Sequence, residues 1–179
     1  LRLSKRAADR GVIYPAAHFP LTGLEQAELD LPPELVLSIA RQESEFNHTV
    51  SSHVGARGLM QLMPGTAKLV ARSLGIRYRQ SQLTTDASYN TRLGVAHLDE
   101  LLGDYSGSYI MTAAAYNAGP GRVSRWMNEF GDPRSPSIDV IDWIELIPFS
   151  ETRNYVQRVI ENTQIYRQRL AGNRPVPLN

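Results

Sequence analysis

Hydrophobic side chains recur at helical spacing along most of this chain, and no segment shows the strict alternation of a half-buried strand. The clearest stripe lies in residues 31–44, where Val36, Ile39 and Ala40 fall on one helical face. The Pro32-Pro33 pair suits the first turn of such a helix, because a missing N–H has no intrahelical partner to lose there. The pattern predicts a helix over residues 31–44.

Glu43 is the next member of this stripe, so a carboxyl group stands where an apolar side chain is expected. It also lies in the last turn, where the helix dipole is negative. Burial and the dipole both disfavour the ionised form, so we expect the pKa of Glu43 to be raised. A carboxyl group that stays protonated near neutral pH can act as a general acid. The alternative is that Glu43 simply ends the helix and points to water.

The same periodicity predicts several further helices and therefore a mainly α fold with little or no β structure. Asp86 is a plausible N-cap for one of them and Ser150 for the last. Gly75 and the Gly119-Pro120 pair are typical helix terminators. Residues 76–85 read as a polar connection. The expected helices cover residues 64–74, 86–102, 109–118, 123–130, 140–147 and 150–170.

The chain divides into three expected parts. Residues 1–30 form a lead-in with a short basic amphipathic piece, which could be the end of a preceding helical region. Residues 31–171 form one domain, and residues 172–179 form a proline-containing flexible tail. No apolar run reaches transmembrane length, and the sequence shows no signal peptide.

Composition narrows the classes of chemistry. The net charge of the 179 residues is +1, which argues against a nucleic-acid partner. Cysteine is absent, so thiol catalysis and Cys-ligated zinc are excluded. His48 and His53 lie in a loop without accompanying carboxylates, so we expect neither a metal site nor a cofactor. His97 lies on a buried stripe and reads as a hydrogen-bonded core histidine.

Four polar side chains interrupt apolar or small-residue surroundings and suggest the wall of a cleft. Gln61 lies among leucines and methionines, where its amide could hydrogen-bond a ligand. Tyr116 and Asn117 end an alanine-rich helix that another helix or a ligand can approach closely. Glu151 begins the last helix, where the dipole favours its ionised form. If both carboxylates line one cleft, Glu43 is the acid and Glu151 is a charged ligand or orienting group.

Four segments together resemble the catalytic domain of soluble lytic transglycosylases, within the lysozyme superfamily, over roughly residues 14–170. The segments are Ala40-Arg41-Gln42-Glu43-Ser44, Gly55-Ala56-Arg57-Gly58-Leu59-Met60-Gln61-Leu62-Met63-Pro64, Ala115-Tyr116-Asn117-Ala118-Gly119-Pro120-Gly121-Arg122 and Ile147-Pro148-Phe149-Ser150-Glu151-Thr152-Arg153-Asn154-Tyr155-Val156. The resemblance implies a lysozyme-like helical domain with a substrate cleft. It also implies cleavage of the β-1,4 bond between N-acetylmuramic acid and N-acetylglucosamine in peptidoglycan glycan strands, with a 1,6-anhydro product.

In this family pattern Glu43 is the single general acid and base. The expected substrate-binding residues are Ser44, Met60, Gln61, Tyr116, Asn117 and Glu151. Ser44 would be a partner near the Glu43 carboxylate, Met60 and Gln61 would contact sugars, and Tyr116 and Asn117 would hydrogen-bond Glu43 or an N-acetyl group. Arg153 and Tyr155 are weaker candidates, because a surface charge and a core aromatic explain them equally well. The resemblance also implies the periplasm or cell envelope of a bacterium.

Two alternatives stay open. A muramidase would keep the fold but hydrolyse the bond with water, which needs a second carboxylate facing Glu43, and Asp86 or Asp104 could return there through the fold. A non-catalytic peptidoglycan-binding module would not require an acid on an apolar face.

Overall fold

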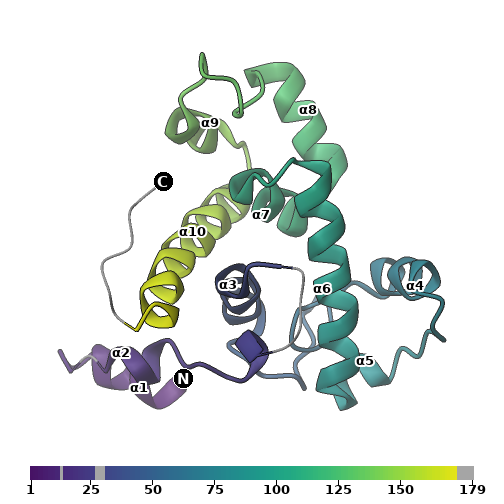
Figure 1. The fold of residues 1–179 in the computed structure, drawn as a ribbon, viewed down its shortest axis with the longest axis vertical. Coiled ribbons are helices and arrows are strands. Elements are labelled where there is room, and N and C mark those ends of the chain that lie inside the picture. The colour runs from purple at the N-terminus through teal and green to yellow at the C-terminus, as the bar shows by residue number, and fades with distance from the viewer. Residues whose placement is uncertain (13, 27–30, 173–179) are drawn as a thin grey trace.

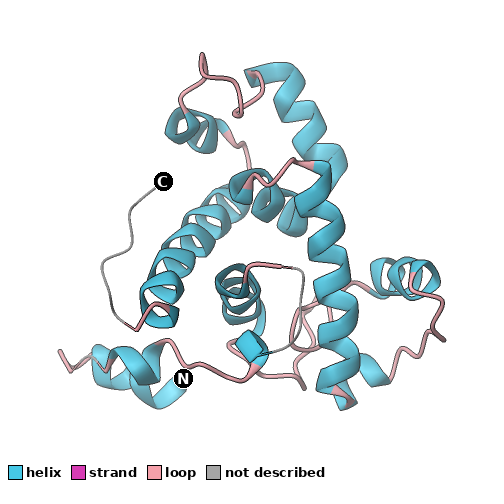
Figure 2. Cartoon of the chain, in the orientation of Figure 1, coloured by secondary structure: helices cyan, strands magenta, loops and turns pink. Residues whose placement is uncertain are grey.

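The computed structural model describes residues 1–12, 14–26 and 31–172, and 64% of these residues are helical. Strands are absent from these ranges, which contain only two isolated bridges, Ser51 to Arg57 and Arg57 to Leu62. The prediction of a mainly α fold is confirmed (Figure 2). The helices are α1 (Arg2–Ala8), α2 (Pro15–His18), the 3-10 turn η1 (Leu24–Gln26), α3 (Pro33–Ser44), α4 (Pro64–Ser73), α5 (Gln82–Thr85), α6 (Ala87–Asp104), α7 (Tyr109–Ala118), α8 (Pro120–Phe130), α9 (Val140–Leu146) and α10 (Ser150–Leu170).

Helix α3 lies in the middle of the molecule, flanked by α10 and α6 with α7 beside them (Figure 1). It packs chiefly against α10, which in turn packs along α7. Val36, Ile39 and Ala40 are fully buried, as the sequence stripe predicts, but Leu35, Leu37 and Ser38 are fully buried as well, because partners cover more than one face of α3. Burying side chains of this kind is worth roughly 1.5–3 kcal/mol each, so α3 is anchored firmly and its C-terminal end is held at a fixed place.

The sequence predicts most helix boundaries correctly, with three differences. The segment expected to be a polar connection contains α5, because Leu83 is fully buried and pulls it into a turn against α6. Leu74 lies beyond the end of α4 and is 37% exposed. Phe149 rather than Ser150 occupies the N-cap position of α10, without a side-chain cap. Asp86 is confirmed as an N-cap, since its carboxylate accepts a hydrogen bond from the Tyr89 N–H at 3.0 Å.

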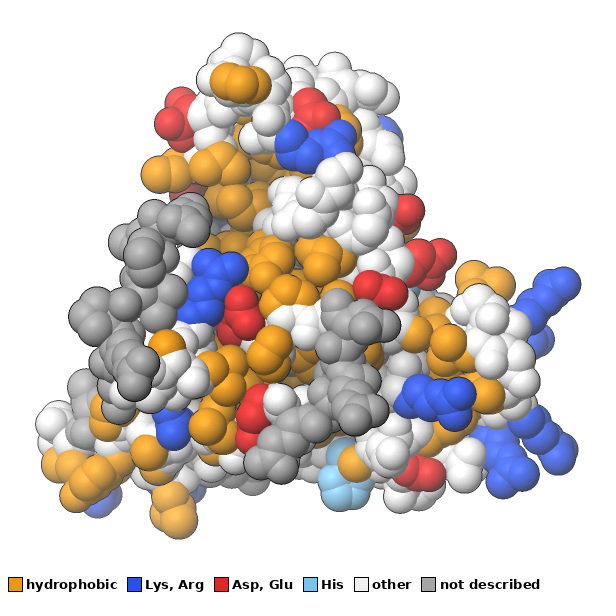
Figure 3. Space-filling view, viewed as in Figure 1, with side chains coloured by type: hydrophobic (Ala, Val, Ile, Leu, Met, Phe, Trp, Pro, Cys, Tyr) orange, Lys and Arg blue, Asp and Glu red, His pale blue; other side chains and the backbone are white. Residues whose placement is uncertain are grey.

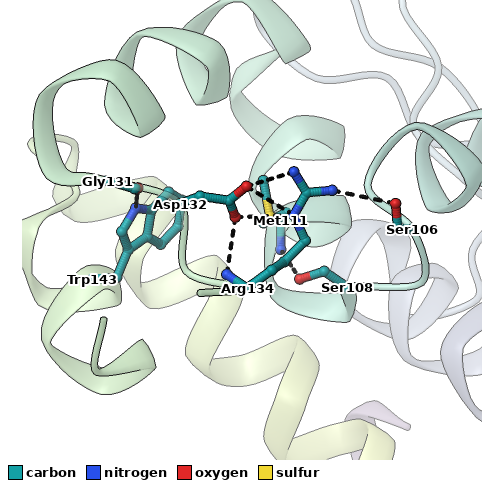
Figure 4. Close-up of polar contacts among 7 residues, drawn as sticks. All are labelled: Ser106, Ser108, Met111, Gly131, Asp132, Arg134 and Trp143. Atoms are coloured by element: carbon teal, nitrogen blue, oxygen red, sulfur yellow. Dashed lines mark hydrogen bonds and ion pairs between the residues drawn. The ribbon is translucent and has the colours of Figure 1, made fainter. Parts of the chain in front are cut away.

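Helices α8 and α9 are joined by a loop that polar contacts hold in place (Figure 4). The Arg134 guanidinium pairs with the Asp132 carboxylate at 2.6 Å and reaches the Ser106 hydroxyl at 3.3 Å. The Trp143 indole N–H donates to the Gly131 carbonyl oxygen at 3.1 Å. These bonds fix α9 and the start of α10, which carries part of the site described below.

The lead-in segment lies against α3 and α10 through cationic side chains. Arg41 donates to the His18 carbonyl oxygen and stacks on the Phe19 ring at 4.2 Å, while Arg169 donates to the Phe19 carbonyl oxygen. On the face drawn in Figure 3, hydrophobic side chains gather across the middle of the molecule. Among the described residues, no helix is both long and apolar enough to cross a membrane. The predicted tail falls almost entirely outside the described residues.

Candidate active site

A cavity of about 540 Å³ contains the Glu43 side chain and is called here the Glu43 pocket. It is built where the ends of α3 and α7, the first half of α10 and the loop after α3 converge. Five of the seven residues predicted for the site line it, namely Glu43, Gln61, Tyr116, Asn117 and Glu151. The lining residues are Gln42, Glu43, Ser52, His53, Val54, Ala56, Gln61, Met63, Tyr116, Asn117, Glu151, Asn154, Tyr155 and Arg158.

Glu43 is half-buried in the last turn of α3, and its environment favours the protonated form. Burial raises the pKa of its carboxyl group to about 7, and the negative charge of Glu151 adds to this rise. A hydrogen bond from Tyr155 opposes it, because it stabilises the carboxylate. The raised pKa expected from the sequence is therefore confirmed in direction, with burial as its largest cause. A carboxyl group with this pKa can release and recover a proton near neutral pH.

Two tyrosines hold the polar framework around Glu43. The Tyr155 hydroxyl donates to Glu43 Oε1 at 2.6 Å, and the Tyr116 hydroxyl donates to the Met60 carbonyl oxygen at 2.8 Å. Burial raises the pKa of both phenols well above their usual range, so both remain donors at neutral pH. Tyr155 leaves Glu43 Oε2 as the oxygen not engaged in this bond.

Tyr155 is more important here than its sequence suggests. Its position four residues after Glu151 places both side chains on one face of α10, which is a signal that could have identified it. Arg153 does not line the Glu43 pocket, and it is half-buried and not the plain surface charge of the alternative interpretation. Its guanidinium donates to the Glu145 and Ile147 carbonyl oxygens at 3.0 Å and so ties α9 to α10.

The loop after α3 reverses direction through backbone conformations that side chains rarely adopt. Glu45 and Phe46 have positive φ angles of 53° and 65°, and Gln61 has a φ of 47°. Each such conformation costs on the order of 1 kcal/mol. Their position directly after Glu43 and within the pocket indicates that the loop geometry is maintained by the surrounding structure.

Asn90 on α6 maintains that loop. Its Oδ1 accepts from the Met60 N–H at 2.8 Å, and its Nδ2 donates to the Arg57 and Leu83 carbonyl oxygens. Gly58 makes room for it, because a Cβ at this position would collide with the Asn90 side chain and the Leu83 carbonyl oxygen. Asn90 was not among the residues predicted for the site. A polar residue inside the apolar stripe of α6 was the available signal.

The structure corrects the predictions for Met60 and Ser44. The Met60 side chain is 0% exposed and packs against Gly94, so it belongs to the core and only its backbone serves the site. Ser44 is buried outside the Glu43 pocket, and its hydroxyl contacts the Leu59 carbonyl oxygen at 2.6 Å. Ser44 therefore anchors the loop after α3 instead of contacting the Glu43 carboxylate. The loop brings Ser52 and Met63 to the pocket in their place.

Gln61, Asn117 and Glu151 line the pocket as predicted, each from a different element. The Gln61 amide nitrogen donates to the Gly58 carbonyl oxygen at 2.8 Å, which orients the side chain. Asn117 Oδ1 accepts from the Thr152 hydroxyl at 2.7 Å. Glu151 is exposed in the first turn of α10.

The remaining candidate carboxylates are used elsewhere. Asp86 caps α6, and Glu45 pairs with Lys5. Asp104 lines a neighbouring cavity of about 510 Å³ together with His97. Within the Glu43 pocket the carboxylates are Glu43 and Glu151.

His97 differs from the expected hydrogen-bonded core histidine. Its ring lies 5.5 Å from the Tyr116 ring, and burial lowers its pKa. Nδ1 has no hydrogen-bond partner among the described residues and lies 3.9 Å from Glu100 Oε2. No group of three or more His, Cys, Asp or Glu side chains within the described ranges could hold a metal ion.

Comparison with known proteins identifies the family of the chain. The family model described as "Transglycosylase SLT domain" matches residues 23–136, and the model described as "Soluble lytic transglycosylase helical domain" matches residues 146–175. The soluble lytic murein transglycosylase of Escherichia coli K12 is 37% identical over 163 residues, which cover 90% of this chain and 24% of that protein. A putative soluble lytic murein transglycosylase of Haemophilus influenzae is 40% identical over 152 residues, covering 78% of this chain and 25% of the relative.

Solved structures give the same result. The 70 kDa soluble lytic transglycosylase of Escherichia coli superposes with a TM-score of 0.79 at 37% identity, over 87% of this chain and 26% of that one. An inactive glutamate-to-glutamine variant of the lytic transglycosylase Slt from Pseudomonas aeruginosa superposes with a TM-score of 0.70 at 39% identity. The superposition covers 97% of this chain and 25% of that one. The chain thus spans about a quarter of the length of these relatives. Since the first family model covers well over half of its residues, the chain belongs to the SLT transglycosylase family.

Proposed function

We propose that this chain is the catalytic domain of a peptidoglycan lytic transglycosylase, with residues 31–171 as the catalytic unit. The observation that carries the proposal is the carboxyl group of Glu43, which has a pKa of about 7 and lies in a pocket lined by hydrogen-bonding side chains. The glycan strand of peptidoglycan is the substrate, and the periplasm or cell envelope of a bacterium is the place of action. The extensive packing of α10 on α3 supports treating the two family matches as one unit.

Protonated Glu43 donates its proton to the oxygen that links N-acetylmuramic acid to N-acetylglucosamine. The bond from C1 to that oxygen breaks, and the N-acetyl oxygen of the muramoyl residue attacks C1 from the opposite side. The ionised Glu43 then takes the proton of the C6 hydroxyl, whose oxygen attacks C1 and displaces the N-acetyl oxygen. The product is the 1,6-anhydro sugar, and no water enters the balance. One carboxyl group therefore serves as acid and then as base.

The surroundings of Glu43 fit these two roles. Tyr155 occupies Oε1, so Oε2 carries the transferred proton. The hydrogen bond from Tyr155 strengthens when Glu43 becomes negative, which stabilises the ionised intermediate. Gln61, Tyr116, Asn117 and Glu151 are the proposed substrate-binding residues, because all four line the same pocket.

Glu151 gives the hydrolytic alternative its one specific support, since it is a second carboxylate in the Glu43 pocket. A muramidase of the two-carboxylate type needs such a group to activate water or to bind C1 covalently. The products separate the two reactions, because an anhydro end lacks one water relative to a reducing end.

The test is digestion of purified peptidoglycan with the chain and with its Glu43→Gln variant, followed by mass spectrometry. We expect anhydro-muropeptides from the wild type and a loss of at least about 10³-fold in the variant. Gln is nearly isosteric with protonated Glu and can still accept from Tyr155. Circular dichroism serves as the control for folding. Reducing-end products from the wild type would replace the proposal with a muramidase, and no products would favour a binding module.

A further inference from the structure

Thr152 is a buried residue that touches the site without lining the Glu43 pocket. It lies in the first turn of α10, is 3% exposed, and donates its hydroxyl hydrogen to Asn117 Oδ1 at 2.7 Å. Asn117 lies in the last turn of α7 and lines the Glu43 pocket and both of its neighbouring cavities. The Thr152 hydroxyl is thus the link between two helices at the point where these cavities meet.

The direction of this hydrogen bond determines what Asn117 offers to a ligand. An Asn amide has an acceptor oxygen on one side and a donor NH₂ group on the other. Because Oδ1 accepts from Thr152, the NH₂ group is on the opposite side of the amide. Among the described residues, nothing accepts a hydrogen bond from Asn117 Nδ2. Asn117 Nδ2 is not fully buried, because it is absent from the set of buried polar atoms that lack a hydrogen-bond partner. The NH₂ group is therefore accessible from the cavities that Asn117 lines.

Rotating the Asn117 amide so that Oδ1 and Nδ2 exchange places would give a less favourable hydrogen-bond arrangement. It would place Nδ2 against the Thr152 oxygen, and the hydroxyl hydrogen would need another acceptor. The described contacts of Thr152 provide no second acceptor, so the hydroxyl oxygen could accept from Nδ2 but the buried hydroxyl hydrogen would be left without an acceptor. The side-chain geometry of Thr152 therefore selects one of the two amide orientations.

We propose that Thr152 is a positioning residue that holds Asn117 as a hydrogen-bond donor toward the N-acetyl carbonyl oxygen of the glycan. An amide carbonyl is the strongest neutral acceptor on such a sugar, and a donor held in a fixed orientation discriminates against a ligand that lacks this oxygen. This inference rests on the proposed function and adds to it Thr152 as the residue that sets which group Asn117 presents to the glycan.

The experiment compares the binding of an N-acetylglucosamine trimer and its de-N-acetylated counterpart by calorimetry. The proteins are the wild type, Thr152→Val, Thr152→Ser and Thr163→Val. Thr163 is the matched control, because it is a buried threonine of the same helix whose hydroxyl bonds Val159 and Ser38 away from the site. Thermal unfolding of each protein reports general destabilisation.

We expect Thr152→Val to reduce the preference for the acetylated trimer by about tenfold, while Thr152→Ser and Thr163→Val keep it. The side-chain NH₂ resonances of Asn117, assigned by their loss in Asn117→Asp, should shift in Thr152→Val and not in Thr163→Val. An unchanged preference in Thr152→Val, or an equal loss in Thr163→Val, would overturn the proposal. If the wild type releases anhydro products without preferring the acetylated trimer, this inference alone fails. If it does neither, the proposed function fails as well.

Discussion

Replacing Glu43 by Gln should stabilise the protein, and the gain should depend on pH in a defined way. In the unfolded chain the Glu43 carboxyl titrates near its ordinary pKa of 4.5, whereas in the folded protein it titrates near about 7. Gln cannot titrate in this range. The variant therefore removes a single titration and leaves a side chain of nearly the same shape that can still accept from Tyr155.

The magnitude follows from the difference between the two pKa values. One pKa unit corresponds to ~1.4 kcal/mol, so a rise from 4.5 to about 7 corresponds to about 3 kcal/mol. Between these pH values the folded state binds more protons than the unfolded state. Wild-type stability attributable to Glu43 therefore falls as pH rises through this window, and it is constant outside it. Below about pH 4.5 the variant and the wild type should be almost equally stable.

The assay is urea unfolding of wild type and Glu43→Gln at pH 4, 6 and 8, with the difference in free energy of unfolding taken at each pH. Groups that do not interact with Glu43 contribute equally in both proteins and cancel in that difference. The gain should grow from near zero at pH 4 to about 2–3 kcal/mol at pH 8. Glu129→Gln is the control, because Glu129 is exposed on α8 and should show no such trend. A pH-independent difference for Glu43→Gln would refute the argument that burial of this carboxyl opposes its ionisation.

Three further predictions concern neighbouring residues. Glu151→Gln should leave more residual peptidoglycan cleavage than Glu43→Gln, because Glu151 is an exposed orienting group; equal abolition by both would indicate a carboxylate pair and favour hydrolysis. Tyr155→Phe should move the alkaline limit of the pH–rate profile upward, because it removes the hydrogen bond that lowers the Glu43 pKa; an unmoved limit would mean that a different group sets it. Asn90→Ala should lower the free energy of unfolding in urea by about 3 kcal/mol, since the Met60 N–H and two carbonyl oxygens lose their partner; a loss below about 1 kcal/mol would show that water replaces it.

The cost at Glu43 is consistent with the general conflict between stability and activity. In the proposed function, the buried acid lowers stability at neutral pH at the position where its proton is used. The positive φ angles that follow Glu43 have the same character, because they add local strain next to it.

The sequence by itself determined most of the helices, with α5 as an exception, because helical periodicity is a local property that neighbouring residues express together. It located α3 and α7 closely, and it identified Glu43 as a carboxyl on an apolar face. Each of these conclusions needs only residues within a few turns of one another. The raised pKa of Glu43 follows from the same local reasoning, since any partner that covers the stripe also covers the carboxyl.

Only the tertiary structure decided which side chains face Glu43. Ser44 and Met60 are adjacent to the site in sequence but are used in tertiary contacts away from the Glu43 pocket. The Ser44 hydroxyl bonds the Leu59 carbonyl oxygen, and the Met60 side chain is buried against Gly94 on α6. Tyr155 reaches Glu43 from 112 residues away, because α10 packs along α3 in one register. Such contacts depend on how helices distant in sequence pack together. No local pattern shows which helices pack together. From the sequence, Tyr155 could be either a site residue or an ordinary core aromatic.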